Sequence, residues 1–227
     1  MKRCYLIYML LLLALPSLSQ RAGTVLPECR GEGERQRLEQ RFFTQQEIPD
    51  EVFSRMKGRS FGRGCTVRRS DLRYLRLLHR NAEGRTQVGE MVCNKAIAAD
   101  LLSIFRQLYR AGYRIGRMVL VDDYGADDLR SMEANNTTCF NFRFVTGSRI
   151  RVSRHGMGMA VDINPLYNPY VKGEKVQPSA ARRYVNRRDT VTMAIRRGDL
   201  CHRLFTQHGF RWGGAWRSLK DYQHFEK

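Results

Sequence analysis

Two short segments near the C-terminal end combine histidine and aspartate residues at spacings that suit a metal centre. The segment SRHGMGMAVD contains His155 and Asp162, and the segment DYQH contains Asp221 and His224. Two imidazoles and one carboxylate are a three-ligand set for a catalytic zinc, which keeps its fourth position open. The sequence therefore predicts one zinc ion bound by His155, Asp162 and His224. Asp221 is the spare carboxylate that could act as general base in a hydrolysis.

These ligands need a particular backbone to meet. His155 and Asp162 are too far apart for one helical turn, but two short strands joined at residues 156–158 could bring both to one metal, because glycines there allow a tight bend. His224 would arrive from a C-terminal strand. Asp221 is either the base or a hydrogen-bond partner of a ligand histidine. Glu226 is either that partner or a surface acid.

The two segments also carry a family resemblance. The pattern S-x-H-x-x-G-x-A-x-D, the stretch WGGAW and the closing D-x-x-H resemble the D-alanyl-D-alanine carboxypeptidase family of zinc peptidases, which includes L-alanyl-D-glutamate endopeptidases. The likeness is strongest over residues 141–226 and reaches back more weakly to about residue 48. It implies the hedgehog/DD-peptidase fold, one zinc ion and hydrolysis of peptidoglycan stem peptides. It also places the metal ligands at His155, Asp162 and His224, and the catalytic acid at Asp221.

One family feature is missing. Several relatives have an arginine after a D-x-Y step, where it stabilises the oxyanion, whereas residues 122–125 here read DDYG. Arg143 is the candidate replacement, since a guanidinium can hold an oxyanion or a carboxylate through paired hydrogen bonds. An ordinary surface arginine is the alternative. Ser153 either binds substrate or caps a turn.

Aromatic residues and further histidines lie near the predicted site in the sequence. Trp212 and Trp216 are spaced to wall a substrate cleft beside His224, or to pack in the core. The remaining histidines have no companion ligand, and we expect none of them to bind metal: His79, His202 and His208.

The N-terminal residues and the charge point to export. Residues 1–19 have a basic start, a short apolar run and small residues at a cleavage position, as in a secretory signal peptide. Its removal lowers the net charge from +18 to +16 and leaves no transmembrane segment, so we expect a soluble periplasmic or extracellular protein. Such a basic protein is attracted to anionic envelope polymers. Nucleic acid is not an expected partner, because no nucleic-acid motif is present.

Hydrophobic patterning predicts an α+β fold, with a small antiparallel sheet carrying the zinc site and helices packed against it. Residues 20–47 form a polar leader, helical from 34 to 43, that either joins the compact domain or lies outside it, and residues 48–227 form the zinc peptidase domain. The secure helix is 95–111, and a second is expected from 189 or 190 to 209. Residues 72–78 favour a strand over a helix. The other expected strands are 88–93, 115–121, 142–145, 150–152, 159–163, 210–212 and 222–225.

Cysteine content leaves the disulfides open. After signal removal, five cysteines remain, which allows up to two bridges in an exported protein: Cys29, Cys65, Cys93, Cys139 and Cys201.

The predicted function is an exported zinc metallopeptidase acting on peptidoglycan peptides. The alternatives are a non-catalytic zinc-containing module that binds cell wall or protein, and a basic polymer-binding protein with an incidental metal site.

Overall fold

The computed structural model describes residues 20–145, 147–148, 150–187 and 193–227. The predicted signal peptide, residues 1–19, lies outside the described residues. In the described part of the chain, every helix is too short or too polar to cross a membrane.

The N-terminal sheet is antiparallel, with strand order β1-β2-β3. Its strands are β1 (Thr44–Gln46), β2 (Leu72–Arg80) and β3 (Thr86–Asn94). The strand interpretation of residues 72–78 is therefore confirmed over the helical one. Between β2 and β3, Asn81 Oδ1 accepts hydrogen bonds from the backbone N–H groups of Glu83 and Arg85, at 3.1 and 2.9 Å. An asparagine side chain that replaces backbone acceptors in this way holds a tight turn.

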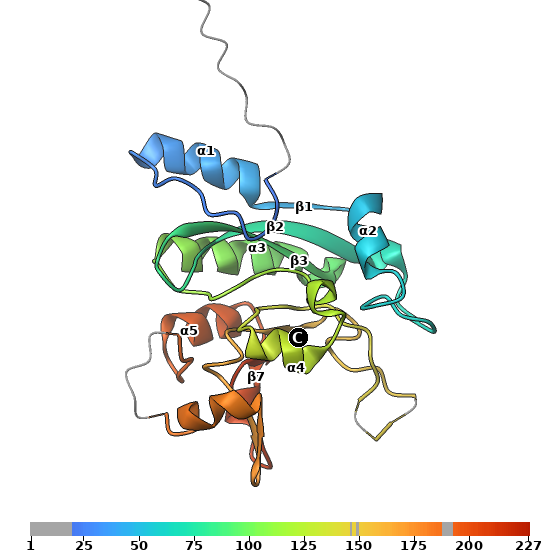
Figure 1. The fold of residues 1–227 in the computed structure, drawn as a ribbon. Coiled ribbons are helices and arrows are strands. Elements are labelled where there is room, and N and C mark those ends of the chain that lie inside the picture. The colour runs from blue at the N-terminus through green and yellow to red at the C-terminus, as the bar shows by residue number, and fades with distance from the viewer. Residues whose placement is uncertain (1–19, 146, 149, 188–192) are drawn as a thin grey trace, which may run out of the picture.

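Helix α3 (Lys95–Arg110) packs across β2 and confirms the helix predicted at 95–111. Asn94 Oδ1 caps its start by accepting from Ala96 N at 3.0 Å. Its apolar stripe is fully buried: Ile97, Leu101, Ile104, Phe105 and Leu108. Figure 1 shows α3 between the first sheet and the C-terminal part of the molecule.

The polar leader is attached to this core. It forms α1 (Glu32–Phe42) and β1, and Phe42 and Phe43 are buried in the same core as α3. Glu39, which is 3 % exposed, forms an ion pair with Arg110 of α3 at 2.6 Å. The stretch 20–47 thus packs against the rest of the protein. Helix α2 (Asp50–Met56) follows and contributes to a second apolar cluster beside β2 and β3.

The C-terminal half contains two further antiparallel sheets. One has strand order β4-β9-β7 and the other β6-β5-β8. Their strands are β4 (Ala160–Asp162), β5 (Tyr170–Lys172), β6 (Lys175–Gln177), β7 (Arg211–Trp212), β8 (Lys220–Asp221) and β9 (His224–Glu226). The helices of this half are α4 (Asp128–Glu133) and α5 (Leu200–Gln207), shown in Figure 1. The structure is α+β with small antiparallel sheets, as predicted, whereas the hedgehog/DD-peptidase likeness stays a prediction.

The strand predicted at 115–121 is wrong. Within this segment the structure shows one isolated bridge, between Arg117 and Asn136, and a second bridge joins Arg80 to the preceding Arg114. Asparagine side chains accept the hydrogen bonds that a neighbouring strand would otherwise accept. Val119 N donates to Asn136 Oδ1, and Gly116 N donates to Asn164 Oδ1, both at 2.9 Å.

Three other predicted elements also differ. The helix expected from residue 189 or 190 begins at Leu200, where Asp199 caps it by accepting from His202 N at 2.7 Å. Residues 188–192 lie outside the described residues, and 193–199 are not helical. The strands expected at 142–145 and 150–152 reduce to one bridge between Phe144 and Val152.

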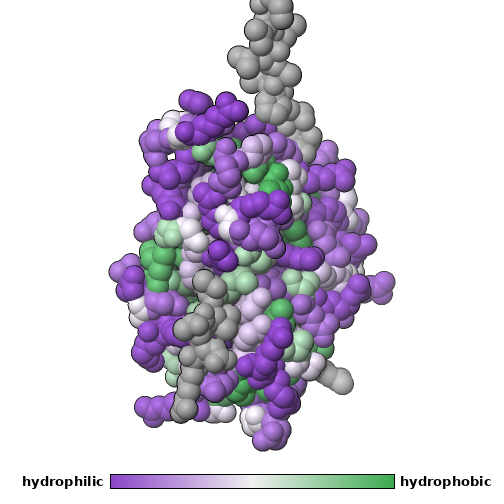
Figure 2. All heavy atoms as spheres, turned by 60° about the vertical axis from the view of Figure 1, so that its left-hand side comes forward, coloured by the Kyte–Doolittle hydropathy of each residue, from purple (hydrophilic) through white to green (hydrophobic). Residues whose placement is uncertain are grey.

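Short 3-10 helices fill several connections: Arg69–Asp71, Val121–Tyr124, Ser179–Tyr184 and Gly213–Ala215. Hydrophilic residues cover most of the face in Figure 2, with scattered apolar patches.

The five cysteines of the described chain are free thiols, and Cys93 is buried as expected.

Candidate metal centre

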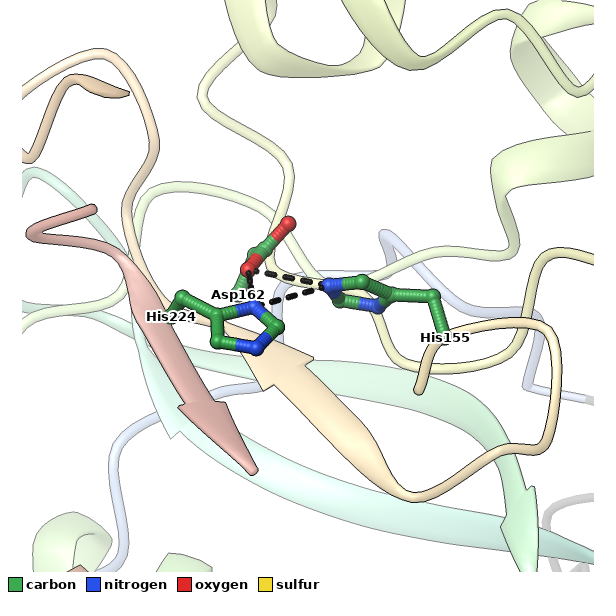
Figure 3. A group of neighbouring side chains, drawn as sticks. All are labelled: His155, Asp162 and His224. Atoms are coloured by element: carbon green, nitrogen blue, oxygen red, sulfur yellow. Dashed lines mark hydrogen bonds and ion pairs between the residues drawn. The ribbon is translucent and has the colours of Figure 1, made fainter. Parts of the chain in front are cut away.

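Three buried side chains from the segments 153–162 and 221–224 converge on one point. His155 Nε2 lies 3.1 Å from His224 Nδ1, and Asp162 Oδ1 lies 3.2 Å from each of these nitrogens. Figure 3 shows the three groups pointing toward one another. The structure therefore brings together the ligands predicted from the sequence, as a group that could hold a metal ion.

Strand pairing aligns two of the three ligands. Asp162 ends β4, His224 begins β9, and the two are direct partners in the antiparallel register. Direct cross-strand partners have side chains within contact distance on one face of the sheet. His155 comes from the turn before β4, where its carbonyl accepts from Asn141 N at 3.2 Å.

The glycines of this turn are required by close packing. A Cβ on Gly156 would lie 2.7 Å from the carbonyl oxygen of Arg143. Gly158 has a φ of +68°, and a Cβ there would lie 2.7 Å from Asn94 N. Only glycine fits such a left-handed, crowded position without strain. The turn is thereby pressed against the end of β3, which fixes the position of His155.

In both His155 and His224, the ring nitrogen that faces away from the cluster also has a partner. His155 Nδ1 lies 2.8 Å from the carbonyl oxygen of Cys139, which can only accept, so Nδ1 carries the hydrogen and Nε2 offers a lone pair to the cluster. His224 Nε2 lies 3.3 Å from Glu226 Oε2, and Glu226 Oε1 accepts from Arg211 at 2.8 Å. These contacts orient both ligand nitrogens toward Asp162.

Electrostatics at the cluster favour a cation. Burial opposes ionisation of Asp162, but His155 and His224 outweigh it and hold the pKa of Asp162 below its usual value. Burial likewise disfavours a charged His224, but hydrogen bonds to Asp162 and Glu226 and the nearby Asp221 raise its pKa to about 10. Three carboxylates around two imidazoles thus create a site that stabilises positive charge.

The donor set and its dimensions fit zinc. Zinc bonds of 2.0–2.1 Å in a tetrahedral arrangement imply ligand atoms about 3.3 Å apart. The three observed separations, 3.1, 3.2 and 3.2 Å, are close to this value. Two nitrogens and one carboxylate oxygen also match the ligands of catalytic zinc sites.

Asp221 lies beside the cluster at the end of β8, where it pairs with Tyr170 of β5. Its Oδ1 is buried and has no hydrogen-bond partner among the described residues. Burial, together with the negative charge of Asp162, raises its pKa to about 6, although His224, His155 and a hydrogen bond from Gln223 lower it. An orphaned carboxylate oxygen with a raised pKa is the property expected of a general acid–base group.

Gly213 lets Asp221 and His224 approach each other. A Cβ on Gly213 would lie 2.7 Å from Asp221 O, 2.9 Å from Asp221 Cβ and 3.2 Å from His224 Cβ. We did not infer from the sequence that position 213 must be glycine, although the Gly213-Gly214 pair between two tryptophans could have indicated a tightly packed turn. The Cys139 carbonyl was also missed, because a backbone contact leaves no mark on residue type.

The other predicted site residues lie nearby in different environments. Arg143 Nε forms an ion pair with Asp128 at 3.0 Å. Ser153 Oγ accepts from Gly156 N at 2.9 Å, which matches the turn-capping alternative. Trp216 is half-buried, with its ring 5.3 Å from that of His224. Trp212 is 7 % exposed and packs in the core against Phe225, which matches the packing alternative.

The remaining histidines contact other groups. His79 is buried, and its Nδ1 lies 2.9 Å from Ile115 O. His208 pairs with Asp100 at 3.0 Å, and the His202 ring lies against Trp212.

Comparison with known proteins points to the same part of the chain. The family model for D-alanyl-D-alanine carboxypeptidase matches residues 146–227, which include the three cluster residues and Asp221. The C-terminal part of this chain resembles the D-alanyl-D-alanine carboxypeptidase family. This likeness supports a peptidase. Arg143 and the N-terminal sheet lie outside the matched segment. Neither the curated proteins nor the solved structures gave a match.

Proposed function

We propose that the protein is an exported, zinc-dependent metallopeptidase that hydrolyses peptide bonds in peptidoglycan stem peptides. The observation that carries the proposal is the buried triangle of His155, Asp162 and His224 beside the orphaned carboxylate of Asp221, all within the segment that resembles the peptidase family. The proposed fold is that of the hedgehog/DD-peptidase group.

The chain's own residues have separate roles in this proposal. Zinc held by His155, Asp162 and His224 would supply an activated water and polarise the scissile carbonyl. Asp221 accepts a proton from the attacking water and delivers it to the leaving amine, which its raised pKa favours. Arg143 stabilises the oxygen on which negative charge develops. Trp216, beside His224, forms part of the wall against which the substrate lies.

The scissile bond is either a terminal D-alanine link or the internal L-Ala–D-Glu link. The net charge, +18 for the full chain and +16 after removal of residues 1–19, would concentrate the protein at an anionic envelope polymer, where its substrate lies. The proposal that the protein is exported rests on the signal-peptide pattern of residues 1–19.

Mass spectrometry of purified muropeptides incubated with the zinc-loaded protein tests this proposal. Loss of alanine would identify a carboxypeptidase, and a cut after the first alanine an endopeptidase. A chelator and the Asp221→Asn variant should each abolish the products. Zinc binding and peptidoglycan binding without any cleavage would instead favour the non-catalytic cell-wall module.

A further inference from the structure

Asp128 has two partners that connect it to the metal centre. Its Oδ2 forms the ion pair with Arg143 Nε at 3.0 Å, and its Oδ1 accepts from Asn141 Nδ2 at 2.8 Å. Both carboxylate oxygens are therefore used, each by a different residue of the segment 141–143. The side chains of Arg143 and Asp128 are 36 % and 34 % exposed, so the pair is partly open to solvent and does not lie in the core.

The segment 141–143 is hydrogen-bonded to the predicted metal ligand His155 and to Ser153, two residues before it. Asn141 N donates to the carbonyl of His155 at 3.2 Å, and Ser153 N donates to the carbonyl of Arg143 at 2.9 Å. Gly156 packs so closely on Arg143 that a Cβ would lie 2.7 Å from its carbonyl oxygen. The backbone of Arg143 is thus fixed relative to His155, and its side chain is held by the ion pair with Asp128.

The helix that carries Asp128 is anchored at both ends. At its start, Asp127 Oδ1 accepts from the N–H groups of Leu129 and Arg130, at 2.9 and 3.2 Å. Near its other end, Met132 Sδ lies 3.3 Å from Gln223 Nε2, in the turn before His224. Helix α4 therefore contacts both halves of the metal site and holds Asp128 in a fixed place.

We infer that Asp128 is a positioning residue that aims the guanidinium of Arg143 at the substrate, an inference that rests on the proposed peptidase function. Asp128 engages Nε, Arg143 Nη1 donates to Asn141 O at 3.4 Å, and Nη2 makes no hydrogen bond within the described parts of the chain. Nη2 is thus the donor available to an oxyanion or a substrate carboxylate. A half-exposed ion pair contributes little to stability. Its loss should therefore affect catalysis, through misplacement of Arg143, far more than folding.

A double-mutant cycle tests the coupling. Asp128→Asn should lower kcat roughly tenfold or more, and Arg143→Ala roughly a hundredfold, with the zinc content unchanged. In the Arg143→Ala background, Asp128→Asn should have no further effect, because Asp128 acts through Arg143. The matched control is Asp50→Asn, which breaks a comparable exposed ion pair with Arg69, at 2.6 Å, and should leave kcat unchanged.

A second readout is independent of turnover. In protein labelled with ¹⁵N-arginine, Asp128→Asn should lower the NMR order parameter of the Arg143 Nε–H group, because the ion pair that restrains this side chain is lost. Asp50→Asn, which breaks the pair with Arg69, should leave it unchanged. An unchanged order parameter for Arg143, an unchanged kcat, or an equal loss of kcat in the Arg143→Ala background would overturn the inference. An inactive wild-type protein with bound zinc would overturn the proposed function and the inference together, whereas an active wild type with a fully active Asp128→Asn variant would overturn the inference alone.

Discussion

Glu226 Oε2 lies 3.3 Å from His224 Nε2, on the opposite side of the imidazole from the nitrogen that faces Asp162. Arg211 of the neighbouring strand holds the other oxygen of Glu226. A chain of contacts therefore runs from the protein surface to the candidate metal site, and it fixes both the ring orientation and the tautomer of His224.

Glu226→Gln should weaken zinc binding without abolishing it. The amide keeps the shape of the side chain but loses the negative charge that increases the basicity of His224, and changes of this kind cost roughly 10–100-fold in metal affinity. Titration with a competing zinc chelator measures the effect. Arg211→Ala, which removes only the outermost contact, is the control and should change the affinity less. Equal affinities for Glu226→Gln and the wild type would contradict this role of Glu226.

Metal binding and turnover should separate in two variants. His155→Ala removes a ligand and should lose the zinc. Asp221→Asn leaves all three ligands and should keep it, while turnover falls to background because no group can accept the proton. Metal analysis of both purified proteins, with muropeptide cleavage measured in parallel, checks this. Zinc loss from Asp221→Asn would show that Asp221 is a ligand or a structural partner and not the base.

The sequence indicated the ligand residues because metal chemistry restricts residue type. His155, Asp162 and His224 were chosen for their donor atoms, and the antiparallel pairing of β4 with β9 places two of them side by side. The contacts that orient them were harder to predict. The Cys139 carbonyl and the bare backbone of Gly213 depend on tertiary packing, which residue type does not reveal.

The fold was predictable where local pattern and local structure agree. Helix α3 has an apolar stripe, a capping Asn94 and a closing Gly112, and its predicted bounds differ from the structure by one residue. The segment 115–121 is also largely apolar, but two of its backbone N–H groups donate to the side chains of Asn136 and Asn164, which lie far from it in the sequence. These long-range hydrogen bonds determine the irregular backbone of that segment, and the hydrophobic pattern alone could not reveal them.

Gly213→Ala should reduce activity more than it reduces zinc affinity. The new methyl group would meet the Asp221 carbonyl at 2.7 Å, so the backbone must shift and carry the carboxylate of Asp221 with it. Overpacking of this kind costs about 1–3 kcal/mol of stability. Urea unfolding and steady-state kinetics measure the two effects. Gly173→Ala, in the turn between β5 and β6, is the control, because it has a φ of +55° but no atom within 4 Å of the added methyl. Full activity in Gly213→Ala would contradict the close approach of Asp221.

His79 should make the fold sensitive to mild acid. Burial lowers its pKa from 6.5 to about 4, with only backbone carbonyls opposing the shift, and its Nε2 has no partner among the described residues. The folded protein therefore keeps His79 neutral while the unfolded chain takes up a proton. Its contribution to stability is complete above pH 6.5 and is lost as the pH falls toward 4. That loss amounts to about 3 kcal/mol, because each pKa unit corresponds to about 1.4 kcal/mol.

The variant His79→Asn isolates this effect, because an asparagine amide cannot titrate but can still donate to Ile115 O, the partner of His79 Nδ1. Urea unfolding is measured from pH 7 to pH 4.5, with a chelator present so that zinc binding by His155 and His224 does not contribute. The variant should be less stable than the wild type at pH 7, because the smaller side chain leaves a cavity. Its free energy of unfolding should fall less steeply with acid, so the two proteins converge toward pH 4.5. Parallel curves would show that His79 is not the buried neutral group that makes the native state acid-sensitive.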